Sequence, residues 1–157
     1  MIKHFVATVY IIKEGKVLLI HHRKLNKWVA PGGHVEANEL PPDAAIREAK
    51  EETGLDVRLF SQDNLTIDRW NAKSIPRPYL CLLEEMPAFK DQPAHQHIDF
   101  VYVGELVGGN EEGKMDEIEG MAWFTLEEIE ALQGDIDIFE ETRQVLRTLL
   151  PAHHFSS

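Results

Sequence analysis

The chain has a single cysteine, few cations and no long apolar run, and each shortage excludes a class of protein. Cys81 has no partner for an internal disulfide, which suits a reducing cytoplasm, and we expect the protein to be located there. We expect Cys81 itself to lie in the core of the protein. The 16 Lys and Arg stand against 27 Asp and Glu, and the resulting net charge of -11 repels a long nucleic acid. The apolar run 5–12 has no cleavage site after it and is far shorter than the ~18 residues of a membrane span. We expect neither a membrane nor a long nucleic acid as a partner.

The 157 residues, 43% of them hydrophobic, are enough for one core, and we expect one domain over residues 1–157. No internal repeat, linker or low-complexity tract divides them. Apolar patterning predicts a hairpin of strands 4–12 and 16–21 and further strands at 56–60, 79–85 and 98–107. Helices are predicted at 126–132 and at 136–150, where Pro151 ends the second one. The remaining segments 61–78, 86–97 and 108–120 are predicted to be loops. This order predicts an α/β (α+β) fold, a mixed sheet between helices in an α/β/α sandwich. The sequence leaves a homodimer open.

A turn followed by a helix is predicted between residues 28 and 54. The segment WVAPGG ends extended structure at Pro31 to Gly33 and allows the backbone to approach a ligand closely. Two prolines at 41–42 fit a first helical turn, although Leu40 is a poor N-cap, and Gly54 stops the helix after Thr53. At 100 degrees per residue, one side of this helix is apolar and small, which favours close packing on a sheet; it consists of Pro42, Ala45, Ile46, Ala49 and Thr53.

Three glutamates lie on an adjoining side of the same helix. Glu48, Glu51 and Glu52 stand at positions i, i+3 and i+4, so their carboxylates converge. Such a cluster of like charges is costly unless a cation neutralises it, and an all-oxygen ligand set favours Mg²⁺ or Mn²⁺. A salt-bridged, exposed helix face is the simpler alternative, because Arg47 and Lys50 could pair with these glutamates. That alternative gives no reason for the glycine turn before the helix.

The pattern of a glycine, five residues, a glutamate, seven residues and then REUxEExGU, with U a bulky aliphatic residue, resembles the signature of the Nudix hydrolase family. The matching residues are Gly33, Glu39, Arg47, Glu48, Glu51, Glu52, Gly54 and Leu55. Ala49 is smaller than the usual aliphatic residue, a departure that concerns packing and not chemistry. The opening strands and the late Trp123 with its following helix add to the resemblance. It implies the Nudix fold and metal-dependent hydrolysis of a nucleoside diphosphate linked to another group.

The resemblance also implies roles for individual residues. Glu48 and Glu52 are the expected metal ligands, joined by Glu51 and by the carbonyl group of Gly32. Arg47 is expected to orient the carboxylates by charge-assisted hydrogen bonds. Glu39 is expected to anchor the loop beside the metal ligands, and Gly33 and Gly54 are expected to have structural roles around the site.

Family members often place the general base outside this motif. The acidic segment 111–119 is the natural source here, with Glu117 and Glu119 nearest to Trp123 and Glu119 our choice. A solvated acidic loop is the equally weighted alternative.

Substrate contacts are sought in two places. The long loop 61–78 carries Trp70 and a basic group of Arg69, Lys73 and Arg77, and it ends near Tyr79; it could stack a base and hold a phosphate, or be an ordinary surface loop. Trp28 is expected to support the core or the loop.

His95, His97 and Asp99 alternate along a predicted strand, which places them on one face and suits a pocket wall. We take His97 and Asp99 as substrate-binding candidates. Their spacing supplies no fourth zinc ligand, so we expect no zinc site there. His21 and His22 are expected to be ordinary strand-end residues.

Two other functions are compatible with the scaffold. A nucleotide-binding sensor of the same fold would tolerate loss of the glutamates, whereas here none is lost. An isoprenyl diphosphate isomerase-like enzyme would need a cysteine and a glutamate as acid and base, and Cys81 alone supports it weakly. The substrate class expected for the hydrolase is a small nucleotide: a nucleoside triphosphate, an oxidised nucleotide, a dinucleotide or a nucleotide sugar.

Overall fold

A computed structural model describes residues 1–113 and 116–155 of the chain. Its strands are β1 (Lys3–Lys13), β2 (Lys16–His22), β3 (Lys27–Val29), β4 (Gly32–His34), β5 (Leu55–Phe60), β6 (Leu80–Met86), β7 (His95–Gly109) and β8 (Ile118–Phe124). Its helices are α1 (Pro41–Thr53), α2 (Leu126–Ala131) and α3 (Glu140–Ala152). None of the helices in these described ranges is both long and apolar enough to cross a membrane.

The strands form one mixed sheet in which β1 is central. The order β3-β2-β1-β7-β5 runs across the sheet, with β4 paired to β1, β6 to β7 and β8 to β2. The predicted hairpin joins β1 and β2 antiparallel, whereas β1 and β7 are parallel over ten residue pairs. At the hairpin turn, Glu14 and Gly15 take positive φ angles of 51 and 77 degrees, which the glycine adopts without strain.

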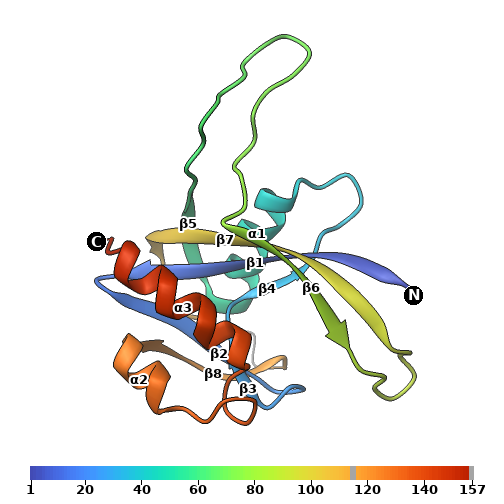
Figure 1. The fold of residues 1–157 in the computed structure, drawn as a ribbon, viewed down its shortest axis with the longest axis vertical. Coiled ribbons are helices and arrows are strands. Elements are labelled where there is room, and N and C mark those ends of the chain that lie inside the picture. The colour runs from blue at the N-terminus through green and yellow to red at the C-terminus, as the bar shows by residue number, and fades with distance from the viewer. Residues whose placement is uncertain (114–115, 156–157) are drawn as a thin grey trace.

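Two apolar clusters lie on opposite faces of the sheet. Ala44, Ala45 and Ala49 of α1 pack on one face of β1, β5 and β7, and the small side chains let the helix approach closely. On the other face, α2 and α3 contribute Ile129, Leu146, Leu149 and Leu150. The expected α/β/α sandwich is therefore confirmed, with α3 on one side of the sheet and α1 on the other (Figure 1).

Strands β3, β4 and β8 were not predicted, and β7 is longer than predicted. We expected Pro31 to Gly33 to end extended structure, but Gly32 to His34 forms β4, because it pairs with residues 6–8 of β1. We expected 108–120 to be a loop, but β7 continues to Gly109 and β8 begins at Ile118; residues 114 and 115 of that segment lie outside the described ranges. β7 also begins earlier than predicted, at His95, where it pairs with Met86.

The observed helices lie where the sequence predicts them, but their ends and buried residues differ in detail. A capping box of Thr125 and Glu128 starts α2 as predicted. The last helix begins at Glu140 and not at 136, and Pro151 lies inside it and does not end it. On α1, Ile46 is exposed and Ala44 takes its expected place in the core.

Of two residues predicted to lie in or support the core, the structure confirms one and contradicts the other. Trp28 supports the core as expected, with its ring edge-on to Phe124. Cys81 is exposed on β6, so its predicted core position is wrong.

Candidate functional site

Helix α1 and the short strand β4 position the glutamates. The helix starts with prolines in its first turn and without a side-chain cap at Leu40, as its sequence indicated. It ends at Gly54, whose φ of 79 degrees is the left-handed conformation that glycine favours. A Cβ atom at Gly54 would lie 2.2 Å from the carbonyl oxygen of Asn110, so the close approach of the next loop also requires glycine.

Glu52 is the most deeply buried of the three glutamates, with 3% of its surface exposed. The backbone N–H of Gly32 donates a 2.7 Å hydrogen bond to its Oε1 atom. A Cβ atom on Gly32 would lie 2.6 Å from the carbonyl oxygen of Ala7, so only glycine lets β4 approach β1 at this point. This contact ties the carboxylate of Glu52 to the glycine segment.

Glu48 lies against the second glycine. A Cβ atom on Gly33 would lie 2.5 Å from the carboxyl carbon of Glu48, so any other residue there would displace this carboxylate. Burial raises the pKa of Glu48, and the charges of Glu51 and Glu117 raise it further, while Arg47 opposes them. A cation beside these carboxylates would have the opposite effect, because it favours the ionised form.

Arg47 connects the carboxylates, as predicted. Its Nε and Nη2 atoms donate to both oxygens of Glu39 at 2.8 and 3.0 Å, and Nη1 donates to Glu48 at 2.9 Å and Glu51 at 3.2 Å. Nη2 also donates to the carbonyl oxygen of His34 at 3.0 Å, which joins the helix to β4. The hydrogen bonds from Arg47 hold the pKa of Glu39 below its usual range. Arg47 therefore fixes the orientation of these acidic groups.

The donor set fits a hard divalent cation. The carboxylates of Glu48, Glu51 and Glu52 lie on α1 beside a backbone segment held closely by glycines, and all these potential ligands are oxygens. Among the described residues, ligand atoms within 4.8 Å of one another are found at His4, His34 and His97 and not at these three glutamates, so their expected convergence is not seen. The raised pKa of Glu48 reports the mutual repulsion and burial that such a cation would relieve.

The segment 116–119 carries acidic residues, one of which acts on a glutamate of α1. Glu117 is the one whose charge raises the pKa of Glu48. Glu119, on β8, accepts a 3.1 Å hydrogen bond at Oε2 from Nδ1 of His21 and lies 3.7 Å from Arg23. His21 thus has a specific partner and is more than an ordinary strand-end residue.

The loop between β5 and β6 leaves the body of the protein as a long excursion (Figure 1). Arg69 lies near its tip, where its N–H bonds the carbonyl oxygen of Ala72, and Trp70 beside it is exposed. At the base of the loop, a groove of about 360 Å³ is lined by Arg77 and other loop residues together with Pro41 of α1 and Tyr102 of β7. Tyr79 lies on the neighbouring hollow of about 170 Å³, which Arg77 also lines. The structure therefore separates Arg69 from Tyr79.

His97 and Asp99 lie on the face of β7 that Val101 shares, the α3 side of the sheet. Asp99 is buried; Thr8 donates a 3.0 Å hydrogen bond to its Oδ2, and its Oδ1 has no partner among the described residues. Burial and the adjacent Asp99 raise the pKa of Glu84 on β6, and burial raises that of Asp99. Thr8 is also the residue paired with Gly32, so Asp99 is linked through Thr8 to the glutamate site.

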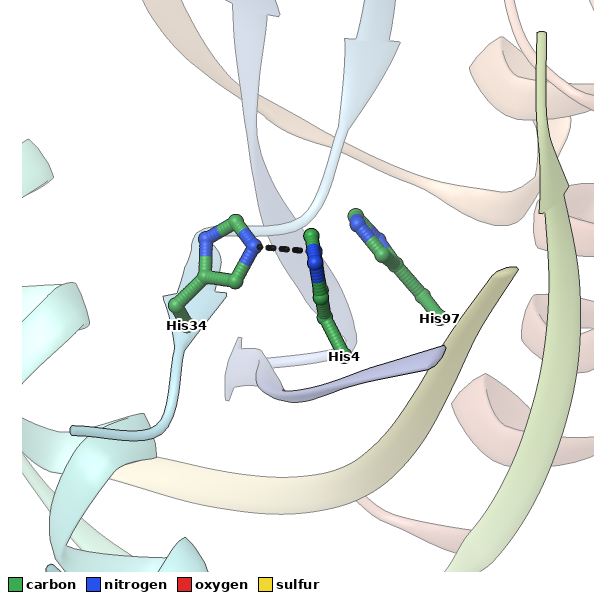
Figure 2. A group of neighbouring side chains, drawn as sticks. All are labelled: His4, His34 and His97. Carbon is green, nitrogen blue, oxygen red and sulfur yellow. Dashed lines mark hydrogen bonds between the residues drawn. The ribbon is translucent and has the colours of Figure 1, made fainter. Parts of the chain in front are cut away.

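Sequence reasoning missed several of these residues. Thr8 interrupts the apolar run of β1 and Glu84 lies next to Glu85 near the end of β6, so no local pattern pointed to either residue. His97 meets His4 and His34, which belong to distant segments (Figure 2). The expectation of no metal site near His97 considered only residues 95–99 and did not foresee those two potential ligands. Burial lowers the pKa of His97 to about 4, assisted by the neighbouring histidines.

Comparison with known proteins identifies relatives over most of the chain. The sequence profile of the NUDIX domain matches residues 3–147. A "Probable DHNTP pyrophosphohydrolase" of Lactococcus lactis subsp. cremoris (strain MG1363) is 34% identical over 125 residues, 80% of this chain and 64% of that protein. A "Putative 8-oxo-dGTP diphosphatase" of Bacillus subtilis (strain 168) is 27% identical over 74% of this chain and 63% of its own length. The chain thus spans less than two thirds of these relatives.

A solved structure has the same fold as this chain over nearly the whole length of both. A hydrolase of the NUDIX family from Clostridium perfringens superposes with a TM-score of 0.77 at 30% identity, covering 97% of this chain and 99% of that one. A MutT NUDIX hydrolase from Burkholderia pseudomallei, with a TM-score of 0.64 and 20% identity, supports the same fold.

Proposed function

The chain belongs to the NUDIX family, and we propose that it is a divalent-metal-dependent hydrolase that cleaves the diphosphate linkage of a small nucleotide-type substrate. The observation that carries this proposal is the arrangement around α1. Arg47 holds Glu39, Glu48 and Glu51 together, while Gly32 holds Glu52. An exposed, salt-bridged helix face would not bury Glu52 or pack the carboxylate of Glu48 against a glycine.

Glu48, Glu52 and Glu51 are the residues that would hold the cation, with the carbonyl group of Gly32 as a further oxygen donor. Mg²⁺ is our choice and Mn²⁺ a substitute, because both prefer oxygen ligands. When bound, the metal neutralises phosphate charge and lowers the pKa of a water molecule. An acidic protein of net charge -11 needs such a cation before an anionic diphosphate can approach its carboxylates.

Arg47, Glu39 and the acidic segment 116–119 would position the carboxylates and activate the attacking water. Arg47 keeps the carboxylates aligned with its fork of donors, and Glu39 fixes the far end of that fork. We place the general base in the segment 116–119, on Glu119 or its neighbour Glu117. The influence of Glu117 on the pKa of Glu48 supports the closeness of this segment to the site. A carboxylate there would take the proton of the attacking water.

For the substrate we propose a nucleoside triphosphate or a related small nucleotide, since the two curated relatives carry the names of a DHNTP pyrophosphohydrolase and an 8-oxo-dGTP diphosphatase. Asp99 is a candidate substrate contact, because its buried Oδ1 makes no hydrogen bond among the described residues and could accept one from a ligand. His97 lies beside it on β7. Tyr79, which lines the second hollow, and Arg69, near the loop tip, are further candidates.

A substrate screen with and without metal tests the proposal. Nucleoside triphosphates, oxidised nucleotides, dinucleotides and nucleotide sugars are incubated with Mg²⁺, with Mn²⁺ or with a chelator, and the products are separated by chromatography. We expect hydrolysis of at least one class with metal and none with chelator. Glu48→Gln should abolish that turnover, whereas Glu127→Gln, the same change on exposed α2, should not. Binding without turnover in every class would favour the sensor function instead.

A further inference from the structure

Four histidines gather at one end of the sheet, away from the hairpin turn of β1 and β2. His4 of β1, His34 of β4 and His97 of β7 each offer a ring nitrogen, and the three nitrogens lie within 4.8 Å of one another (Figure 2). Nε2 of His34 is already 3.3 Å from Nδ1 of His4. In a tetrahedral zinc site with Zn–N bonds of about 2.0–2.1 Å, neighbouring nitrogens are ~3.3 Å apart. One edge of such a site is therefore preformed.

The sheet itself brings these residues together. The parallel pairing of β1 with β7 sets His4 directly beside His97, and the antiparallel pairing of β4 places His34 opposite Val6, two residues along β1. Residues two apart on a strand share a face, so all three rings project from the same side. Because the ligands come from three paired strands, little chain entropy remains to be lost on binding.

His95 supports the group from behind. It is 4% exposed, its Nδ1 atom donates to the carbonyl oxygen of Pro93 at 3.0 Å, and its Nε2 lies 3.1 Å from Nε2 of His97. Outer-shell hydrogen bonds of this kind fix the ring orientation of a ligating histidine. His34 is exposed and the other two rings are half-buried, so an ion can reach them from solvent.

We propose that His4, His34 and His97 form a second metal site that binds one Zn²⁺ ion or a similar transition metal. Imidazole nitrogens select zinc, cobalt, nickel or copper over Mg²⁺, which distinguishes this site from the all-oxygen set on α1. Three protein ligands leave one coordination position for water or a ligand. The proposal does not depend on the hydrolase activity.

Titration with Co²⁺ and Zn²⁺ in saturating Mg²⁺ tests the site. Co²⁺ bound by imidazoles absorbs visible light, and Zn²⁺ should displace it with a stoichiometry of one per chain. We expect His4→Ala and His34→Ala each to weaken Zn²⁺ binding by about tenfold or more, the scale of losing even an outer-shell group. His154→Ala removes an exposed histidine beside Gly15, at the other end of β1, and should change the affinity less than about twofold, within ordinary surface effects.

Two further measurements show whether a lost zinc affinity comes from the histidines, from the glutamates of α1 or from misfolding. Glu48→Gln should leave Zn²⁺ affinity unchanged even if it abolishes hydrolysis. Circular dichroism with a chelator should show that the histidine variants are folded, so that a lost affinity reports lost ligands. Equal zinc affinity in wild-type protein and both histidine variants, or loss of zinc binding in Glu48→Gln, would overturn the proposal and leave a histidine cluster without a metal.

Discussion

Replacing Arg47 by methionine should destabilise the fold, because three carboxylates and one carbonyl group lose their shared donor. The side chain of Arg47 is 23% exposed, and those of Glu39 and Glu48 are 16% and 15% exposed. Glu51 and Glu36 are far more exposed, so their pairs with Arg47 add little. The cost therefore comes from Glu39 and Glu48, which would be left partly buried and unpaired.

The size of the effect follows from these two partners. Removing one member of a buried ion pair typically costs about 3–5 kcal/mol, and pairs at the surface about 0–1 kcal/mol. Because these groups retain some contact with water, we expect a loss of roughly 3 kcal/mol at neutral pH. Arg47→Lys should recover only part of it, since an ammonium group cannot make the two-pronged contact with Glu39.

Urea unfolding in a chelator measures this loss, followed by circular dichroism with wild-type protein, Arg47→Met and Arg47→Lys. Arg58→Met is a suitable control, because Arg58 makes an exposed bond to Glu105 on the same sheet and should cost less than about 1 kcal/mol. An Arg47→Met variant within about 0.5 kcal/mol of wild type, the range of ordinary surface changes, would refute the role given to this residue.

Three further predictions concern the glycine segment, pH and the polar strand face. Gly33→Ala should lower turnover and Mg²⁺ affinity, because its Cβ would displace Glu48; Gly120→Ala, where the added atom meets nothing, is the control for both assays. Mg²⁺ affinity, measured by calorimetry, should fall as pH falls through the raised pKa of Glu48, above the range of an ordinary carboxyl; a flat affinity down to the ordinary range would count against the ligand assignment. Because Glu84 has a raised pKa, the folded state holds its proton more tightly than the unfolded state, so its contribution to stability is full below the ordinary carboxyl pKa and is lost as pH rises toward the raised one. Glu84→Gln should flatten the decline in melting temperature over that window, and an unchanged slope would contradict the raised pKa of Glu84.

The sequence was sufficient for the helix that bears the glutamates, and less so for the sheet around it. The prolines and Gly54 delimit α1, and its residue spacing predicted the pairing of Arg47 with its neighbours, because both depend on contacts within a few residues. β4 escaped prediction because glycine has low strand propensity, and only pairing with β1 makes Gly32 to His34 extended. β8 likewise depends on its pairing with β2.

Contacts between distant segments explain what else was missed. The meeting of His4 with His97 depends on the parallel register of two strands more than ninety residues apart, which no local pattern encodes. The link from Thr8 to Asp99 has the same origin. Pro151 was expected to end a helix, yet it lies in the last turn of α3, where a missing N–H costs only one hydrogen bond.

The claim that α1 holds the catalytic metal is tested most directly by turnover of Glu52→Gln at saturating Mg²⁺, on the substrate that the screen identifies. The glutamine oxygen can still accept the N–H of Gly32, so the fold should persist while the charged ligand is lost. A metal supplies several kcal/mol of transition-state stabilisation, so we predict a fall in kcat of about 100-fold or more, against little change for Glu127→Gln. A Glu52→Gln enzyme that turns over at the wild-type rate would contradict the account.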